Sequence, residues 1–193
     1  DASVAPIVAR INEPGNMPYA CYADVTDLLI SMSSLAGTYT VANVVSNEGT
    51  NYSTGLSAGW TLFVVYEDPT LSMKSFNVFD GFAQIYDTKV EEIPVSGFIT
   101  PQSGSIDLQF AYASLDGDKT IGATKLEFGT KQVTTPLRPA NEFFNATIEN
   151  TNGVQTPRSP SGSNTLGYDT GMLEVAGAEP EYIKNGQTST YFS

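Results

Sequence analysis

The sequence has no histidine, and this absence removes much of enzyme chemistry. Ser-His-Asp and Cys-His nucleophilic systems need an imidazole base, and many zinc and iron sites need imidazole ligands. A carboxylate pair of the glycosidase kind is the catalytic device that remains. Its candidates, Glu67, Asp68, Asp80 and Glu127, belong to residue types that mostly occupy exposed faces. We therefore predict no enzymatic activity and no catalytic residues.

Cysteine is nearly absent as well, since Cys21 is the only one. A single cysteine forms neither an intrachain disulfide nor a thiolate metal cluster, so stability has to come from the core. We predict that Cys21 is a small buried hydrophobe rather than a nucleophile. The sequence also lacks a glycine-rich phosphate loop, so no nucleotide cofactor is indicated.

The sequence also lacks long apolar runs and has few basic residues, and both features limit its possible partners. No run of about 18 consecutive apolar residues occurs, which predicts that the chain does not insert into a membrane. Basic residues are few, because nine Lys and Arg stand against 21 Asp and Glu, a net charge of −12. Such a charge repels nucleic acid and anionic lipid surfaces and is compatible with divalent cations. We expect no nucleic acid partner.

The residues that are present favour β structure. Seventeen Gly, 11 Pro, 10 Tyr and 10 Phe are spread evenly between short apolar runs. This pattern predicts an all-β fold, an antiparallel two-sheet β-sandwich of jelly-roll type, with residues 1–193 as one module. Residues 1–19 are expected to form an edge strand or lead-in, and residues 182–193 a final strand or a link to a next module. Further strands are predicted at residues 38–45, 60–66, 74–82, 91–99, 105–112, 125–128 and 143–149, with a return to the core at residues 172–176.

Residues 60–66, with the sequence WTLFVVY, are the best candidate for a central strand. The run is almost wholly apolar, too short for a typical helix, and rich in aromatic and β-branched residues. Residues 105–112 alternate between apolar and polar types, which is typical of a half-buried strand. We expect the two sheets to bury Trp60, Leu62, Val64, Phe110 and Tyr112.

One short helix is expected near the N-terminus. At residues 24–32 the apolar side chains recur at helical spacing, and Asp24 is placed to cap the first turn. The all-β prediction therefore includes a single helical segment.

The loop Asp116-Gly117-Asp118 is the one candidate ion site. Closely spaced carboxylates around a glycine turn offer oxygens to a hard cation such as Ca²⁺. The loop lacks the third acidic position and the distal Glu of an EF-hand, and Asp-Gly is also a common hairpin turn signal. Asp116 and Asp118 are therefore either calcium ligands or turn residues, and the turn is the favoured interpretation.

Six segments in a characteristic order resemble a known class of module. They are ADVTDL at residues 23–28, YTVAN at 39–43, GWTLFVVYEDP at 59–69, VFDGF at 78–82, NEFFNATI at 141–148 and NTLGYD at 164–169. Together they are similar to the large β-sandwich modules of giant secreted surface proteins of Bacteroidetes and other bacteria, including gliding-motility adhesins. The resemblance covers roughly residues 22–175.

The resemblance implies export to the cell surface, by the type IX route in Bacteroidetes, and a place in a long chain of repeated modules. It implies no catalytic residues. We therefore expect an extracellular, non-enzymatic module that acts in extension and attachment, with neighbouring modules of the same or another surface chain as partners. The alternative is a calcium-assisted carbohydrate-binding module, in which Tyr52, Tyr168 or Tyr182 stacks on glycans or surface polymers.

Overall fold

A computed structural model gives the fold of most of the chain. It describes residues 7–10, 19–44, 57–83, 85, 87–120, 122–154, 158–159, 161–175 and 182–193. The chain divides into two compact units, which comprise Asp1–Asn43 with Asn77–Glu91, and Val44–Phe76 with Glu92–Ser193. The buried hydrophobic residues of the described part of the chain all belong to the second unit.

The first unit contains a two-stranded antiparallel sheet and a short helix. Strand β1 (Ile7–Arg10) pairs with strand β2 (Tyr19–Tyr22). Helix α1 (Thr26–Ile30) follows, and the Asp24 carboxylate accepts a hydrogen bond from the Thr26 N–H at 2.9 Å. The predicted helix is confirmed, although it is shorter than expected.

The expectation that Cys21 is buried is wrong. Cys21 lies in β2 and its side chain is exposed. A sheet of only two strands has little apolar surface to cover its own residues, so a small hydrophobe in it gains no burial.

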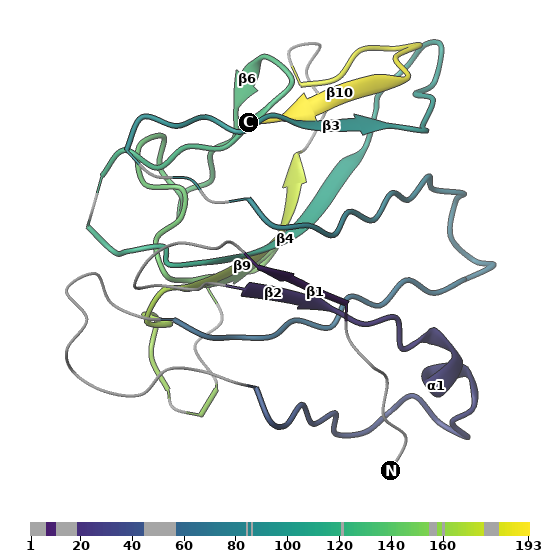
Figure 1. The fold of residues 1–193 in the computed structure, drawn as a ribbon. Coiled ribbons are helices and arrows are strands. Elements are labelled where there is room, and N and C mark those ends of the chain that lie inside the picture. Colours follow the sequence, from purple (N-terminus) through teal and green to yellow (C-terminus); the bar gives the residue numbers. More distant parts are fainter. Residues whose placement is uncertain are drawn as a thin grey trace. The chain divides into compact units, whose positions relative to one another are not determined.

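In the second unit, one sheet has the strand order β3-β10-β5-β6 and is antiparallel throughout. In Figure 1, β3, β6 and β10 lie together at the top. The C-terminal strand β10 is central, because it pairs with β3 on one side and β5 on the other. The strands are β3 (Ile93–Ser96), β5 (Glu127–Phe128), β6 (Lys131–Gln132) and β10 (Ser189–Phe192).

The other sheet of this unit has the strand order β4-β9-β7-β8. Its longest pairing is the antiparallel one between β4 and β9, which runs over all eight residues of each strand. Strand β7 pairs in parallel with β9, which departs from the fully antiparallel arrangement that we expected. The strands are β4 (Leu108–Leu115), β7 (Ile148–Asn150), β8 (Gly153–Val154) and β9 (Tyr168–Val175).

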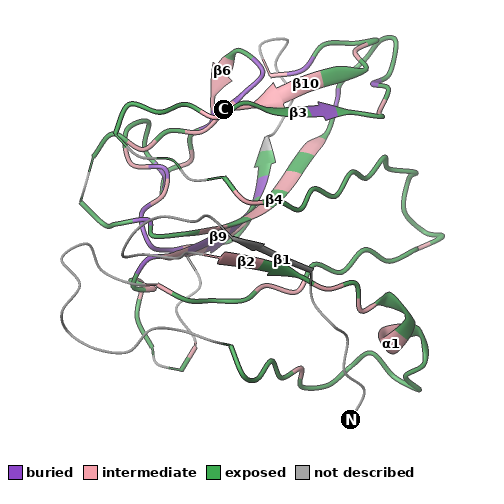
Figure 2. Ribbon diagram, in the orientation of Figure 1, coloured by how far each residue is buried: buried purple, intermediate pink, exposed green. Residues whose placement is uncertain are grey.

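The core of the second unit lies between the two sheets. Phe110 on β4 joins them, because its ring centroid lies 6.4 Å from that of Phe128 on β5 and 5.5 Å from that of Phe192 on β10. Figure 2 shows buried residues on strands such as β9, whereas the long segments outside the sheets are mostly exposed. The buried cluster consists of Ile106, Phe128, Val133, Phe143, Leu173 and Ile183. The predicted β-sandwich class with one short helix is therefore confirmed.

Strand predictions succeeded where the pattern alternates. Along β4, half-buried and exposed residues alternate without a break, and Phe110 and Tyr112 pack against the core as predicted. The predicted strands at residues 91–99 and 125–128 contain β3 and β5, and the expected final strand is β10. Alternation of apolar and polar residues predicts a strand and its buried side because successive side chains of a strand point to opposite faces.

Three strand predictions are wrong. Residues 60–66 and 74–82 form no strand in their described parts, and neither do residues 38–44. Trp60 is 47% exposed and Val64 is 52% exposed, so neither belongs to the core. An apolar, β-branched run favours extended backbone, but a strand forms only where a neighbour completes the hydrogen-bond ladder. No strand in the described part of the chain pairs with these segments.

The prediction for residues 143–149 holds only at the end of the range, where β7 begins at Ile148. The preceding residues form a buried loop instead. Separately, no helix among the described residues combines the length and the apolar character that crossing a bilayer demands.

A pair of Phe→Ala substitutions tests where the core lies. Phe143 is fully buried in the second unit, whereas Phe76 in the same unit is 63% exposed. We expect Phe143→Ala to lower the free energy of unfolding by about 3–5 kcal/mol, because it leaves a cavity. Phe76→Ala is expected to change it by about 0.5 kcal/mol or less. Urea unfolding followed by circular dichroism measures both, and equal effects would contradict the described core.

Candidate functional site

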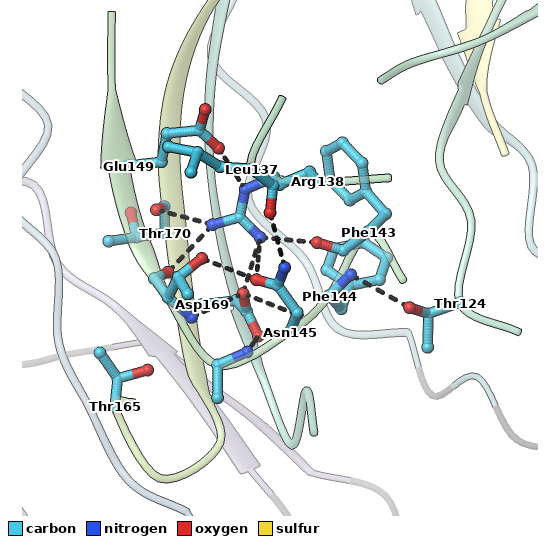
Figure 3. Close-up of polar contacts among 12 residues, drawn as sticks. Thr124, Leu137, Arg138, Phe143, Phe144, Asn145, Glu149, Thr165, Asp169 and Thr170 are labelled. Atoms are coloured by element: carbon cyan, nitrogen blue, oxygen red, sulfur yellow. Dashed lines mark hydrogen bonds and ion pairs between the residues drawn. The ribbon is translucent and has the colours of Figure 1, made fainter. Parts of the chain in front are cut away.

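Three charged side chains are buried together in the second unit. Arg138 and Asp169 have no exposed surface, and Glu149 is 6% exposed. We call these three residues the buried charge cluster. Figure 3 shows Arg138 between Glu149 on one side and Asp169 on the other. Charged groups are rarely buried unless they are paired, so the contacts of each member decide what the site can do.

The carboxylate of Asp169 is held by backbone donors. Its Oδ1 accepts from the N–H groups of Asn145 and Thr147 at 3.2 Å each, and its Oδ2 accepts from the Ala146 N–H at 2.8 Å. Ala146 has a φ of 53°, in the left-handed region. This turn lets three consecutive N–H groups converge on one anion, the arrangement known as a nest.

The guanidinium of Arg138 fills the space between the carboxylates. Its Nη1 donates to Asp169 Oδ1 at 2.8 Å and to the Phe143 carbonyl at 2.6 Å, while Nη2 donates to the Thr147 carbonyl at 3.0 Å. Its planar group also lies 5.3 Å from the ring centroid of Tyr112, within cation–π range. Five donors in a fixed fork suit this task, which a lysine ammonium could not perform.

Glu149 on β7 completes the buried charge cluster. Its Oε2 lies 2.8 Å from the Nε of Arg138 as an ion pair that lacks hydrogen-bond alignment. Its Oε1 accepts a hydrogen bond from the Thr135 hydroxyl at 2.9 Å. The cluster therefore ties β7, β9 and the loop around Arg138 to one another.

The cluster has one cation and two carboxylates, so its formal charge is −1 when all three are ionised. The Asp169 oxygens already accept four hydrogen bonds from the protein, and the guanidinium already donates to backbone and carboxylate oxygens. General acid–base work requires a carboxyl within reach of a substrate proton. Asp169 has no exposed surface, so the geometry favours a structural role.

The predicted ion loop packs directly against this cluster. Gly117 is buried, and its N–H donates to the Gly167 carbonyl at 3.2 Å. A β-carbon at Gly117 would overlap Asp169 Oδ2 and stand 3.0 Å from the Phe144 carbonyl carbon. The glycine is therefore required for a close approach of backbone to carboxylate, which is a different reason from the hairpin turn that the sequence favours.

The flanking aspartates, Asp116 and Asp118, are both exposed. The Asp116 N–H donates to the Ser57 hydroxyl at 3.0 Å, and Asp116 has a φ of 67°. Although Asp116 as a whole is exposed, partial desolvation of its carboxyl raises the pKa of that group, and the negative charge of Asp118 raises the pKa further. No group of three or more His, Cys, Asp or Glu side chains suited to a metal occurs among the described residues. Calcium binding at Asp116 and Asp118 stays a prediction.

A groove of about 550 Å³ lies beside strand β10. Its wall includes two tyrosines, Tyr182 and Tyr191, and one lysine, Lys184, but no acidic residue. The Tyr182 hydroxyl donates to the Gln132 carbonyl at 3.1 Å, which fixes the ring on β6. The remaining lining residues are Gly129, Thr130, Asn185, Gly186, Gln187, Ser189 and Thr190.

Tyr168 and Tyr52 are the other two tyrosines expected to stack on a glycan in the carbohydrate-binding alternative. Tyr168 is half-buried, and its hydroxyl donates to the Trp60 carbonyl at 2.8 Å. A β-carbon at Gly59 would overlap the Tyr168 ring, so the chain itself covers part of it. Tyr168 is therefore a packing residue. Tyr52 lies outside the described residues.

Sequence reasoning missed Arg138 and Glu149 altogether. Arg138 sits between prolines in the loop Leu137-Arg138-Pro139, where no periodic pattern marks it as buried. Glu149 falls in a predicted strand, but its alternation gives no sign that a charge points inward. A weak signal existed in the composition, because with only nine basic residues in the chain each arginine is a candidate for a specific partner.

Comparison of the chain with protein-family models, with curated proteins and with solved structures finds no match.

A pair of Gly→Ala substitutions in one loop tests the packing against Asp169. At Gly117 the added methyl overlaps a buried carboxylate, whereas at Gly122 the nearest atom lies 3.8 Å away. We expect Gly117→Ala to lower the free energy of unfolding by about 1–3 kcal/mol or more through overpacking. Gly122→Ala is expected to be neutral or slightly stabilising. Thermal unfolding of both variants measures this, and equal melting temperatures would show that Gly117 does not contact the cluster.

Proposed function

We propose that the chain is a non-enzymatic structural and adhesive module of a secreted bacterial surface protein, acting in extension and attachment. The observation that carries the proposal is the buried charge cluster. Its charged groups are committed to one another and to backbone, and its effect is to tie several segments of one sandwich together.

Such a cluster suits a module that has no disulfide. A surface module has to keep its fold outside the cell, and many small secreted domains do so with disulfides, which a single cysteine cannot provide within one chain. Removing one partner of a buried ion pair leaves an uncompensated charge, so the arrangement is costly to break. Arg138 thus provides part of the cross-linking between segments that a disulfide would otherwise provide.

The position of β10 also favours a module that transmits load. Two hydrogen bonds join Glu127 to Ser193 beside this strand, with N···O distances of 2.7 and 3.1 Å, and the Gly129 N–H donates to the Tyr191 carbonyl at 2.9 Å. Because β10 pairs on both sides, pulling on it loads two neighbouring strands at once.

The second candidate is a calcium-assisted carbohydrate-binding module, and the groove near β10 favours it. In a chain with 21 acidic residues, a groove lined by two tyrosines, amides and hydroxyls without one acidic side chain is a distinct surface. Tyrosine rings and amide groups match the apolar and polar faces of a sugar. The groove polar groups are partly used internally, because the Gln187 side chain bonds to Lys184 and to Ser189. This favours the structural function over the carbohydrate-binding one.

Mechanical stretching of a tandem repeat of the full chain tests the proposed load-bearing role. We expect discrete force peaks from the wild-type chain and clearly lower peaks from Arg138→Met, because the substitution leaves Asp169 and Glu149 buried without their cation. In solution the same substitution is expected to cost about 3–5 kcal/mol of unfolding free energy. Arg158→Met is the matched control, since Arg158 donates to one exposed carbonyl. A wild-type chain that extends without a force peak would contradict the proposal.

A glycan array, probed with calcium and with chelator, separates the two candidate functions. The structural module is expected to bind no glycan in either condition. The carbohydrate-binding alternative requires binding that Tyr191→Ala reduces by at least about tenfold, the effect of losing roughly 1.4 kcal/mol of stacking. Chelator-sensitive binding that Asp116→Asn abolishes would in addition assign the calcium to that loop.

A further inference from the structure

Of the six large apolar side chains in residues 60–66, five are exposed and the sixth, Leu62, is half-buried. The exposed fractions are 47% for Trp60, 50% for Phe63, 52% for Val64, 56% for Val65 and 70% for Tyr66. Single exposed hydrophobes are normal, but a contiguous apolar surface on a folded protein marks an interaction site. The run is therefore a candidate interface.

The backbone of this segment is also largely without hydrogen-bond partners in the described part of the chain. The Trp60 carbonyl accepts a hydrogen bond from Tyr168, and the Thr61 hydroxyl also contacts the Tyr168 hydroxyl. In the described part of the chain, residues 62–66 make no hydrogen bond. A segment with free N–H and C=O groups and a strand-forming sequence is a template for pairing with another strand.

We propose that residues 60–66 pair antiparallel with the same residues of a second copy of the chain, around a two-fold axis at Phe63. This two-fold strand pair would add a self-association surface to the proposed module and does not depend on its adhesive role. Each segment then supplies hydrogen-bond partners to the facing edge of the other, and side chains directly opposite each other cover part of each other's apolar surface.

The charges at the end of the segment select the antiparallel arrangement. Glu67 and Asp68 follow the run directly. A parallel pair in register would place each of these carboxylates beside its own copy, and like charges directly opposite each other are destabilising. In the antiparallel pair centred on Phe63, Glu67 lies opposite Gly59 and Asp68 lies opposite Ala58. Pro69 then ends the ladder, because proline has no N–H to donate.

The same register brings the two largest side chains together. Trp60 of one copy lies opposite Tyr66 of the other, and this pair occurs twice because of the symmetry. Aromatic pairs across antiparallel strands contribute about 0.2–1 kcal/mol beyond a pair of alanines. The two-fold arrangement thus gives each end of the ladder an aromatic pair without an opposing charge.

The exposed apolar area limits how strongly two copies associate. The five exposed side chains offer on the order of 500 Å² of uncovered surface, since a large aromatic buries about 150–250 Å² when fully covered. This is below the roughly 800 Å² per partner of a standard interface, so the expected dimer is weak and depends on concentration.

Net charge opposes this association and gives it a characteristic salt dependence. Each copy carries a net charge of −12, so two copies repel each other at long range. Salt screens that repulsion and leaves the apolar contacts unaffected. Association through residues 60–66 therefore strengthens as ionic strength rises, whereas association through complementary charges weakens.

Analytical ultracentrifugation of the full chain over a range of concentrations tests the proposal. We expect a concentration-dependent dimer that is favoured by added sodium chloride. Val64→Lys is expected to lower the association constant by at least about 100-fold, because it brings an unpaired charge into the interface. Val90→Lys is the matched control, since Val90 is 70% exposed and lies outside the segment. It is expected to leave the dimer unchanged.

Two outcomes of this experiment overturn the proposal. One is a wild-type chain that stays monomeric at all concentrations and salt levels. The other is a dimer that Val64→Lys leaves intact. A monomer that Val64→Lys destabilises would mean that the segment packs against its own chain.

Cysteine cross-linking locates the axis independently. In a Cys21→Ser background, Phe63→Cys places two thiols opposite each other across the two-fold axis, at the spacing of a cross-strand pair. We expect rapid formation of a disulfide-linked dimer on mild oxidation. Met73→Cys, which exposes a thiol fully but off the axis, is expected to react much more slowly. Equal rates for the two variants would refute the register.

Discussion

The ion pair between Arg138 and Asp169 is the constraint on which much of the second unit depends. Both side chains are fully buried, and their contact at 2.8 Å is surrounded by backbone donors and acceptors. Neither ion would be stable there alone, because desolvation of an unpaired charge costs several kcal/mol. The loop around Asn145, the strand that carries Asp169 and the loop that carries Arg138 therefore have to assemble together.

Close packing around this ion pair explains the positions of two glycines that local backbone preference does not explain. Gly117 lets a loop approach the Asp169 carboxylate, and Gly171 lies opposite Tyr112 on the neighbouring strand. A β-carbon at Gly171 would stand 2.7 Å from the Tyr112 ring, which in turn lies against the Arg138 guanidinium. Glycine weakens a strand by itself, so its place in the middle of β9 reflects the packing of this aromatic ring.

The features that could be predicted from the sequence are those that depend on neighbouring residues in the chain. The alternation of apolar and polar residues in β4 predicted that Phe110 and Tyr112 lie on the buried face of the strand, because side-chain direction follows from strand geometry alone. The buried charge cluster was not predictable in this way. Arg138 and Asp169 are 31 residues apart, and nothing in the sequence around either indicates the other. The Asp116-Gly117-Asp118 loop was recognised as special, but the reason lay in its contact with Asp169.

The failed prediction for residues 60–66 has the opposite cause. Local sequence preference there is strong, yet the described part of the chain supplies no strand to complete the ladder. In β4 and β9 the same kind of preference is satisfied, because each strand has the other over eight residues. A strand is a property of a pair of segments, so a segment with strand chemistry and no partner points to a partner elsewhere. The flanking charges at Glu67 and Asp68 then limit which partner fits, and an antiparallel copy of the same segment meets that limit.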